Sequence, residues 1–226
     1  MGRLEVRSPP MARTALPTTT APLSSALDEV PRLVVRQSRD WVELLDWEVP
    51  NRYALLTERG ALAGWALEHA GGGGAMLLRW FLKANRPFEM GVVSADGGRE
   101  EVLRLRRPFT WFFARLELED GSGRPVGLVR QRFAVLRRRF DVEGPGGRLL
   151  ARITGPLLHP WTFVFTAPND DRELGRIEKR WSGAASELFT DADTFLVTFG
   201  RADATLRRLM LAAAVLLDFR YFESTD

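Results

Sequence analysis

Cysteine is absent from the 226 residues of this chain. Its absence excludes a disulfide framework, a thiol nucleophile, a thiolate zinc site and S-acylation. Histidine occurs only at His69 and His159, which excludes a histidine-rich metal centre. Neither histidine lies near a Ser-bearing elbow or a carboxylate pair in the sequence. No catalytic constellation emerges, and we do not expect an enzyme.

Lysine is almost absent too, because Lys83 and Lys179 are the only lysines among 32 basic residues. The formal net charge is +3, but the charge is unevenly spread. Residues 99–152 contain thirteen Arg against seven Asp and Glu, whereas residues 160–226 contain eight basic against eleven acidic residues. The middle third is therefore a candidate anion-facing surface, for phosphates of nucleic acid or of lipid headgroups.

No hydrophobic run is long enough to span a bilayer. The longest run, Leu209 to Leu217, would rise about 14 Å as a helix, about half the thickness of the hydrocarbon core. The run is apolar on every helical face, which is typical of a helix surrounded by protein. We therefore predict a buried helix over about residues 204–222 and no transmembrane helix.

The first 32 residues are rich in Pro, Thr and Ser and show no hydrophobic period. This composition predicts a disordered tail over residues 1–32, followed by a single domain over residues 33–226. No apolar h-region is present, so we expect no signal peptide.

Turn-forming residues recur about every 24 residues, at Ser94–Gly98, Asp120–Gly123, Glu143–Gly147 and Asn169–Asp171, with an earlier turn at Glu58–Gly60. The interval fits two strands and two connections. Between the turns, apolar and charged residues alternate with period two, as Leu103 and Leu105 do with Arg104 and Arg106. This pattern is typical of an antiparallel sheet with one buried face.

Five hairpins, with further strands near Trp41–Leu45 and at Phe195–Phe199, make about twelve strands. An open sheet of that size would curl or split and would expose its edges. Closing the sheet around the apolar C-terminal helix removes the edges and buries the helix. We therefore predict a mainly β fold, a closed antiparallel barrel of about twelve strands around a buried C-terminal helix.

The connections at the other end of the predicted barrel are unexpectedly apolar. Three of them, each beside a proline, span residues 76–82, 109–113 and 157–161. In one interpretation these side chains plug the mouth of the barrel. In the other they enter a membrane interface, while Arg79, Lys83, Arg107 and Arg115 meet headgroup phosphates. The candidate lipid-contact residues are Leu77, Leu78, Arg79, Trp80, Phe81, Trp111, Phe112, Phe113, Arg115, Leu158 and Trp161.

Several motifs are similar to those of the phospholipid scramblase family. In chain order they are 51–53, 86–88, 107–109, 155–156, 179–183, 189–195 and 217–224. The chain is identified as a cysteine-free member of bacterial type, with the resemblance running from about Val34 to Ser224. The resemblance implies a tubby-like barrel and ATP-independent, bidirectional movement of phospholipids between leaflets. It implies association with the membrane from its cytoplasmic side.

The resemblance also implies a calcium segment, which corresponds here to residues 191–202. Asp191 and Asp193 fit the first two oxygen positions of an EF-hand-like loop, and Asp203 lies one residue late. Phe195, Leu196 and Ala202 stand where further oxygen or glycine is required. The loop is degenerate as a calcium site, and a solvated Asp-rich turn is the alternative.

Two other interpretations remain open from the sequence. In the first, Arg137, Arg138 and Arg139 form an anion-binding face of a soluble tubby-like module for phosphoinositides or nucleic acid. In the second, the apolar loops are the interface of a homo-oligomer. The expected partners are thus a phospholipid membrane, a second copy of the chain, or nucleic acid.

Overall fold

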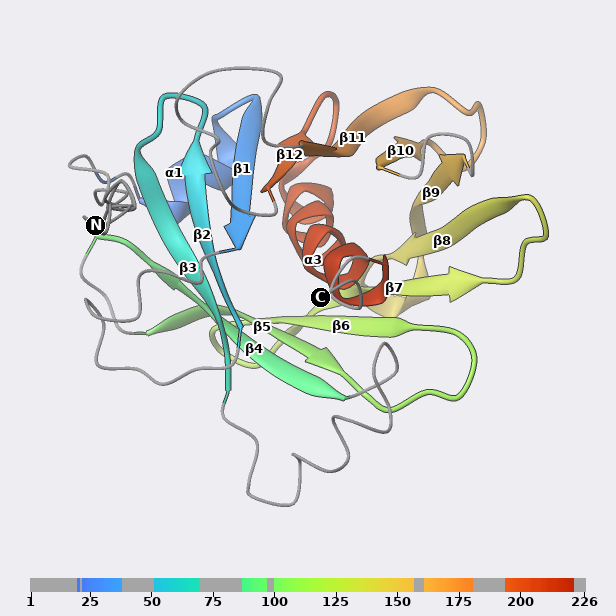
Figure 1. Cartoon of the computed structure of the whole chain (residues 1–226), viewed down its shortest axis with the longest axis horizontal. Helices are drawn as coiled ribbons and strands as arrows, with labels where there is room; N and C mark the ends of the chain where they lie inside the picture. The colour runs from blue at the N-terminus through green and yellow to red at the C-terminus, as the bar shows by residue number, and fades with distance from the viewer. Residues whose placement is uncertain are drawn as a thin grey trace, which may run out of the picture.

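A computed structural model describes residue 20 and residues 22–37, 51–69, 87–96, 100–156, 161–180 and 194–221. The described residues contain twelve strands, which form one closed antiparallel barrel (Figure 1). The strands are β1 (Arg32–Gln37), β2 (Arg52–Thr57), β3 (Leu62–Glu68), β4 (Phe88–Ser94), β5 (Glu101–Arg107), β6 (Arg115–Asp120), β7 (Pro125–Arg132), β8 (Arg137–Glu143), β9 (Leu149–Pro156), β10 (Thr162–Thr166), β11 (Glu173–Arg180) and β12 (Thr194–Thr198). The helices are α1 (Leu23–Asp28), the short 3-10 helix η3 (Pro145–Gly147) and α3 (Ala204–Tyr221).

Each strand pairs with the next along the chain, and β1 closes the barrel by pairing with β12. The predicted closed barrel around a C-terminal helix is confirmed. This is the tubby-like architecture that the resemblance implied. The strand predicted at Phe195–Phe199 is β12. The strand predicted near Trp41–Leu45 lies outside the described residues, and the first strand of the barrel is β1.

The five predicted turns separate β2 from β3, β4 from β5, β6 from β7, β8 from β9, and β10 from β11. Strand β5 illustrates the alternation, because Leu103 and Leu105 are buried inside the barrel whereas Arg104 and Arg106 are exposed. Backbone geometry explains the turn residues at two positions. Gly60 and Asp171 adopt positive φ angles of 77° and 50°, which Gly and Asp tolerate better than most residues.

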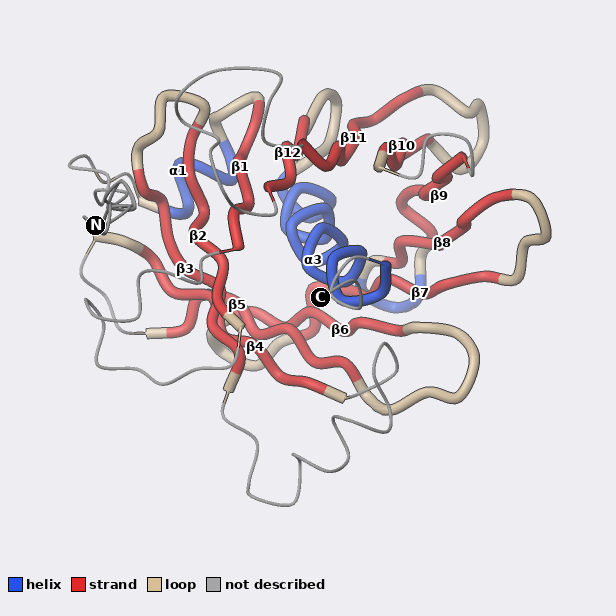
Figure 2. Tube along the Cα trace, viewed as in Figure 1, coloured by secondary structure: helices blue, strands red, loops and turns tan. Residues whose placement is uncertain are grey.

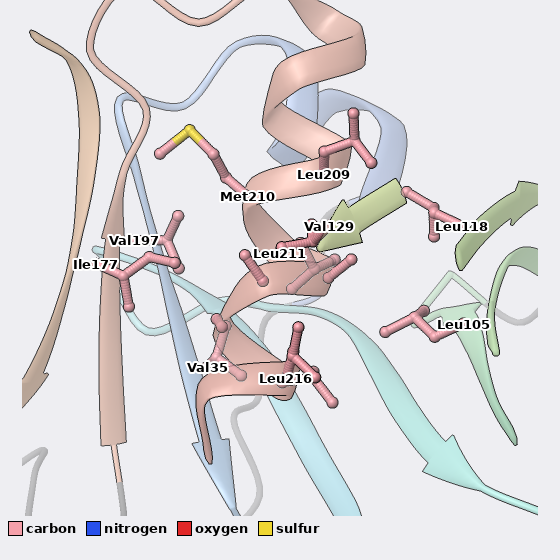
Figure 3. Close-up of a cluster of buried hydrophobic side chains, with 14 of the residues drawn as sticks. Val35, Leu105, Leu118, Val129, Ile177, Val197, Leu209, Met210, Leu211 and Leu216 are labelled. Carbon is pink, nitrogen blue, oxygen red and sulfur yellow. The ribbon is translucent and has the colours of Figure 1, made fainter. Parts of the chain in front are cut away.

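Helix α3 fills the barrel. Every side chain from Leu209 to Phe219 is buried. Figure 3 shows helix residues such as Leu211 and Leu216 among side chains of strands on several sides of the barrel, including Val35, Leu105 and Ile177. The helix therefore needs no polar face. No helix in the described part of the chain is long and apolar enough to cross a membrane.

One polar contact fixes the C-terminal half of α3 inside this apolar core. The buried Tyr53 hydroxyl on β2 donates a 2.6 Å hydrogen bond to an Asp218 carboxylate oxygen. Next to it, the rings of Phe88 and Phe219 stack with centroids 4.2 Å apart. A hydrogen bond to a buried carboxylate is among the stronger ones, so it sets the depth and rotation of the helix in the barrel.

The predicted tail over residues 1–32 was too long. Residues 23–28 form α1, whose Leu23, Ala26 and Leu27 are buried in the barrel core. The Arg207 guanidinium of α3 donates to the carbonyl oxygens of Leu27 and Val30, at 3.0 and 2.9 Å. A helix of six residues is too short to produce a recognisable hydrophobic period, and tertiary contacts stabilise it.

The barrel has two different ends. The turn end carries the connections from even-numbered to odd-numbered strands, and α3 begins there after β12. The rim end carries the connections from odd-numbered to even-numbered strands. Figure 2 shows two of these in tan, the β5–β6 loop (residues 108–114) and the β7–β8 loop (residues 133–136), projecting on the same side of the barrel.

Candidate lipid-contact site at the rim of the barrel

The β5–β6 loop presents aromatic side chains to solvent at the rim end. Trp111 and Phe112 are 75% and 77% exposed, and Phe113 is 45% exposed. Trp161, just before β10, is also exposed and belongs to the same end. The predicted residues Leu77, Leu78, Arg79, Trp80, Phe81 and Leu158, with Lys83, lie outside the described residues.

This loop has a well-anchored base. Gln131 on β7 exchanges hydrogen bonds with Ala114, through its backbone N–H and through its side-chain oxygen. The same side chain contacts the Tyr221 hydroxyl and the Arg220 guanidinium at the end of α3. At the tip, Phe109 and Trp111 pack edge to face with centroids 5.0 Å apart. The exposed aromatics are thus held on a base tied to the core helix.

A second exposed apolar loop was not predicted. Phe133, Val135 and Leu136 in the β7–β8 loop are each at least 75% exposed. In the sequence, Phe133 and Leu136 precede Arg137–Arg139, and only the arginines were considered as a candidate surface. The signal was present as four consecutive apolar residues at a position that the 24-residue period assigns to the rim.

The exposed positions contradict the plug interpretation for the β5–β6 loop, and the side chains of the β7–β8 loop also point away from the interior. The interior of the barrel at this end is filled by Tyr221, the last residue of α3. Its ring stacks on Phe163 and meets Phe140 edge to face. We call the seven most exposed apolar side chains described at this end the apolar rim: Trp111, Phe112, Phe113, Phe133, Val135, Leu136 and Trp161.

Two of the predicted rim arginines have other roles. Arg107 is 1% exposed and faces inward, with its guanidinium 6.0 Å from the centroid of the Phe88 ring. The strand alternation that puts Leu103 and Leu105 inside puts Arg107 there as well. Arg115 lies on the outer surface and forms a 2.7 Å ion pair with Glu117.

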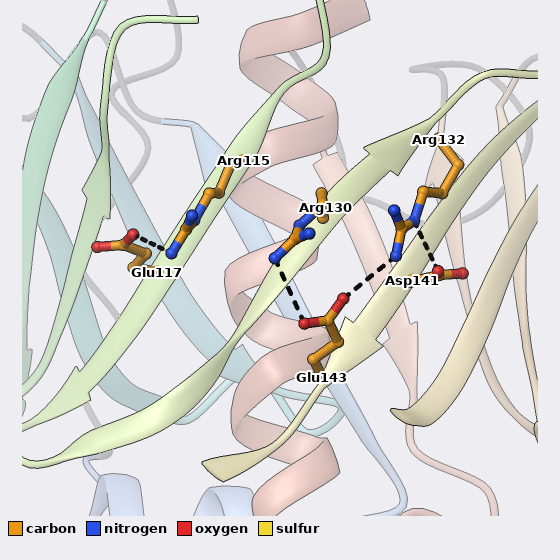
Figure 4. Close-up of polar contacts among 6 residues, drawn as sticks. All are labelled: Arg115, Glu117, Arg130, Arg132, Asp141 and Glu143. Atoms are coloured by element: carbon orange, nitrogen blue, oxygen red, sulfur yellow. Dashed lines mark hydrogen bonds and ion pairs between the residues drawn. The ribbon is translucent and has the colours of Figure 1, made fainter. Parts of the chain in front are cut away.

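Arg115 belongs to a row of ion pairs behind the apolar rim, on β6, β7 and β8 (Figure 4). Arg130 contacts Glu143 at 3.5 Å, and Arg132 contacts Asp141 at 2.7 Å and Glu143 at 3.4 Å. These three carboxylates pair with three of the thirteen arginines of residues 99–152.

The predicted Arg137–Arg139 face is divided by the strand. Arg137 and Arg139 are exposed on the outer side of β8, whereas Arg138 turns inward, 4.0 Å from the centroid of the Tyr221 ring. Burial lowers the pKa of Arg138 and raises the pKa of Tyr221. The three arginines therefore do not form one anion-binding surface, because neighbouring residues of a strand point to opposite faces.

Asp203 of the predicted calcium segment caps a helix. Its carboxylate accepts a 2.8 Å hydrogen bond from the Leu206 N–H in the first turn of α3. Asp191 and Asp193 lie outside the described residues, and those described contain no group of three or more potential metal ligands. The buried Phe195 side chain offers no oxygen. The described part of the segment does not fit a calcium loop.

Replacing Asp203 by Ala is expected to lower the free energy of unfolding by about 1 kcal/mol, because the cap is lost. Asp203→Asn keeps a capping oxygen and should retain most of the stability. Chemical denaturation of the three proteins in the presence of a calcium chelator measures both effects. Equal stability of Asp203→Ala and the parent would contradict the capping role.

The comparisons with known proteins agree with this geometry. Residues 11–224 match the family model described as Scramblase. The chain belongs to the scramblase family. Phospholipid scramblase 2 of Bos taurus is 28% identical over 96% of this chain and 79% of its own length. Phospholipid scramblase 1 of Mus musculus is 27% identical over 92% of this chain but only 66% of its own length.

More distant proteins are similar as well. A phospholipid scramblase family protein of Schizosaccharomyces pombe is 26% identical over 89% of this chain and 62% of its own length. An Arabidopsis thaliana protein of known X-ray structure superposes with a TM-score of 0.48 at 13% identity, over 82% of this chain and 91% of that one. This scramblase-family chain spans 62% to 79% of the length of the curated relatives named here.

Proposed function

We propose that this chain lets phospholipids move between the two leaflets of a membrane, in both directions and without ATP, from a peripheral position on the bilayer. Family membership supports this class of activity, since relatives of the chain are named phospholipid scramblases. The observation that carries the proposal is the apolar rim, seven large apolar side chains exposed at one end of a single barrel. The scramblase family is not a family of catalytic enzymes, and the proposed activity is lipid movement rather than catalysis.

The rim fits the interface of a bilayer better than water. Trp and Phe are favoured between headgroups and acyl chains, and each offers about 150–250 Å² of apolar surface. Trp111 and Phe112 project from adjacent positions on an anchored loop. Their insertion therefore costs little further conformational entropy and supports binding to the bilayer.

The filled barrel interior restricts where a lipid would move. Because α3 occupies the interior, headgroups would pass outside the barrel, in bilayer perturbed by the inserted rim. Disordering one leaflet lowers the barrier for a polar headgroup, since locally thinned and hydrated bilayer reduces its desolvation cost.

A fluorescent-lipid assay tests this function. Vesicles labelled in both leaflets with a nitrobenzoxadiazole lipid are mixed with the purified chain and then reduced from outside with dithionite. The proposal predicts that fluorescence falls past the outer-leaflet pool, with and without a calcium chelator. A loss that stops at the outer-leaflet pool, as in protein-free vesicles, would overturn the proposal.

A further inference from the structure

The arginines on either side of the β7–β8 loop differ in whether a carboxylate neutralises their charge. Arg132, before the loop, has two carboxylate partners in Asp141 and Glu143. Arg137 and Arg139, after it, are exposed and form no ion pair with any residue that the structure describes. The β7–β8 register places Arg139 directly opposite Arg132, so two like charges face each other across the strands.

Like charges directly opposite each other destabilise a sheet. Arg130 and Arg132 on β7 lie on the same outer face as Arg137 and Arg139 on the paired strand β8. Among the described residues of these two strands, Asp141 and Glu143 are the carboxylates that balance them. This surface therefore keeps an uncompensated positive charge of two. It lies immediately behind the exposed apolar tip formed by Phe133, Val135 and Leu136.

We propose that the β7–β8 loop, with Arg137 and Arg139, is a docking element for anionic phospholipid, in which the loop enters the interface and the two guanidinium groups bind headgroup phosphates or carboxylates. The proposal rests on the membrane contact contained in the proposed function and adds the class of lipid that is recognised. It does not depend on lipid movement.

Distances along the strand support this assignment. A strand rises about 3.3 Å per residue, so Arg137 and Arg139 follow Leu136 within about 10 Å. An inserted apolar surface reaches about 5–10 Å into the headgroup and acyl boundary. With the apolar tip at that depth, both arginines lie in the headgroup layer, where their long side chains reach phosphate.

The tip also distinguishes a lipid surface from nucleic acid. Phe133 could stack on a base, but Val135 and Leu136 have no ring and would stay exposed to water against a phosphate backbone. A bilayer buries all three apolar side chains and also satisfies the two cations. The observations therefore favour an anionic membrane.

Vesicle flotation of the full chain tests the proposal. The probes are phosphatidylcholine vesicles and phosphatidylcholine vesicles containing phosphatidylserine, at low salt. Arg137→Gln/Arg139→Gln should bind the phosphatidylserine vesicles about 30-fold more weakly than the parent, with binding to neutral vesicles almost unchanged. The matched control is Arg59→Gln/Arg148→Gln, which removes the same charge from two exposed positions at the turn end and should bind within about twofold of the parent.

A third variant, Leu136→Ser, should weaken binding to both kinds of vesicle, because it removes apolar insertion.

The proposal is overturned if Arg137→Gln/Arg139→Gln binds phosphatidylserine vesicles like the parent, or if the turn-end control loses as much affinity. It is also overturned if the variant loses binding to a DNA oligonucleotide while keeping its binding to anionic vesicles. Because flotation requires no scrambling, a chain that selects anionic vesicles without moving lipid would refute only the proposed function.

Discussion

Ala213→Asp is expected to unfold the barrel. Ala213 is fully buried at the middle of α3, and side chains of the surrounding strands pack on the helix. An aspartate there would bury a carboxyl group without a partner in a space that fits one methyl group. The combined cost of desolvation and overpacking is about 5 kcal/mol, which is comparable with the whole stability of many domains.

Urea denaturation followed by tryptophan fluorescence measures this effect. The matched control is Ala204→Asp, the same substitution at an exposed position in the first turn of the same helix. A carboxylate there faces the positive end of the helix dipole, so the control should be as stable as the parent or slightly more stable. A folded Ala213→Asp protein with parent-like stability would show that α3 does not form the core.

Trp111→Ser/Phe112→Ser is expected to weaken binding to neutral vesicles at high salt by at least about 100-fold. If about half of the exposed surface of each side chain inserts, each contributes about 2 kcal/mol. High salt screens the arginines, so the measurement isolates apolar insertion. Scrambling by this variant should fall in parallel, because the rim is the proposed site of contact.

The control for this variant is Val102→Ser, which removes an apolar side chain that is 39% exposed near the turn end of β5. It should bind vesicles like the parent. Both substitutions lie on the surface, so the unfolding transitions of the three proteins should coincide. Vesicle binding by Trp111→Ser/Phe112→Ser that equals that of the parent would exclude this loop as an insertion element.

The fold could be predicted because two strong local signals agree. The 24-residue spacing of turns indicates hairpins, and the run from Leu209 to Leu217 is apolar on every face. A closed sheet around a helix satisfies both. Helix α1 was missed because six residues are too few to show a helical pattern of apolar residues. The contacts with Arg207 that stabilise it also come from about 180 residues later in the chain.

The site could be predicted only in part. Spacing places Trp111 and Phe112 at the rim, and the structure finds them exposed there. The spacing of residues in the sequence does not reveal which arginines are neutralised, because the partner of Arg132 is Asp141 on the neighbouring strand. The inward turn of Arg138 onto Tyr221 also depends on a contact between β8 and the end of α3. Pairing of this kind is a tertiary property that a run of three arginines does not encode.

The orientation of the barrel on the bilayer is the most direct test of the account. Because the chain has no cysteine, a single cysteine can carry a polarity-sensitive nitrobenzoxadiazole dye at any chosen position. The two positions are Ala134 in the β7–β8 loop and Ser122 in the turn between β6 and β7, at opposite ends of the barrel. On addition of phosphatidylserine-containing vesicles, the dye at position 134 should shift to the blue and brighten, whereas the dye at position 122 should stay unchanged. A shift at position 122, or no shift at position 134 on vesicles that bind the protein, would contradict a rim that faces the membrane.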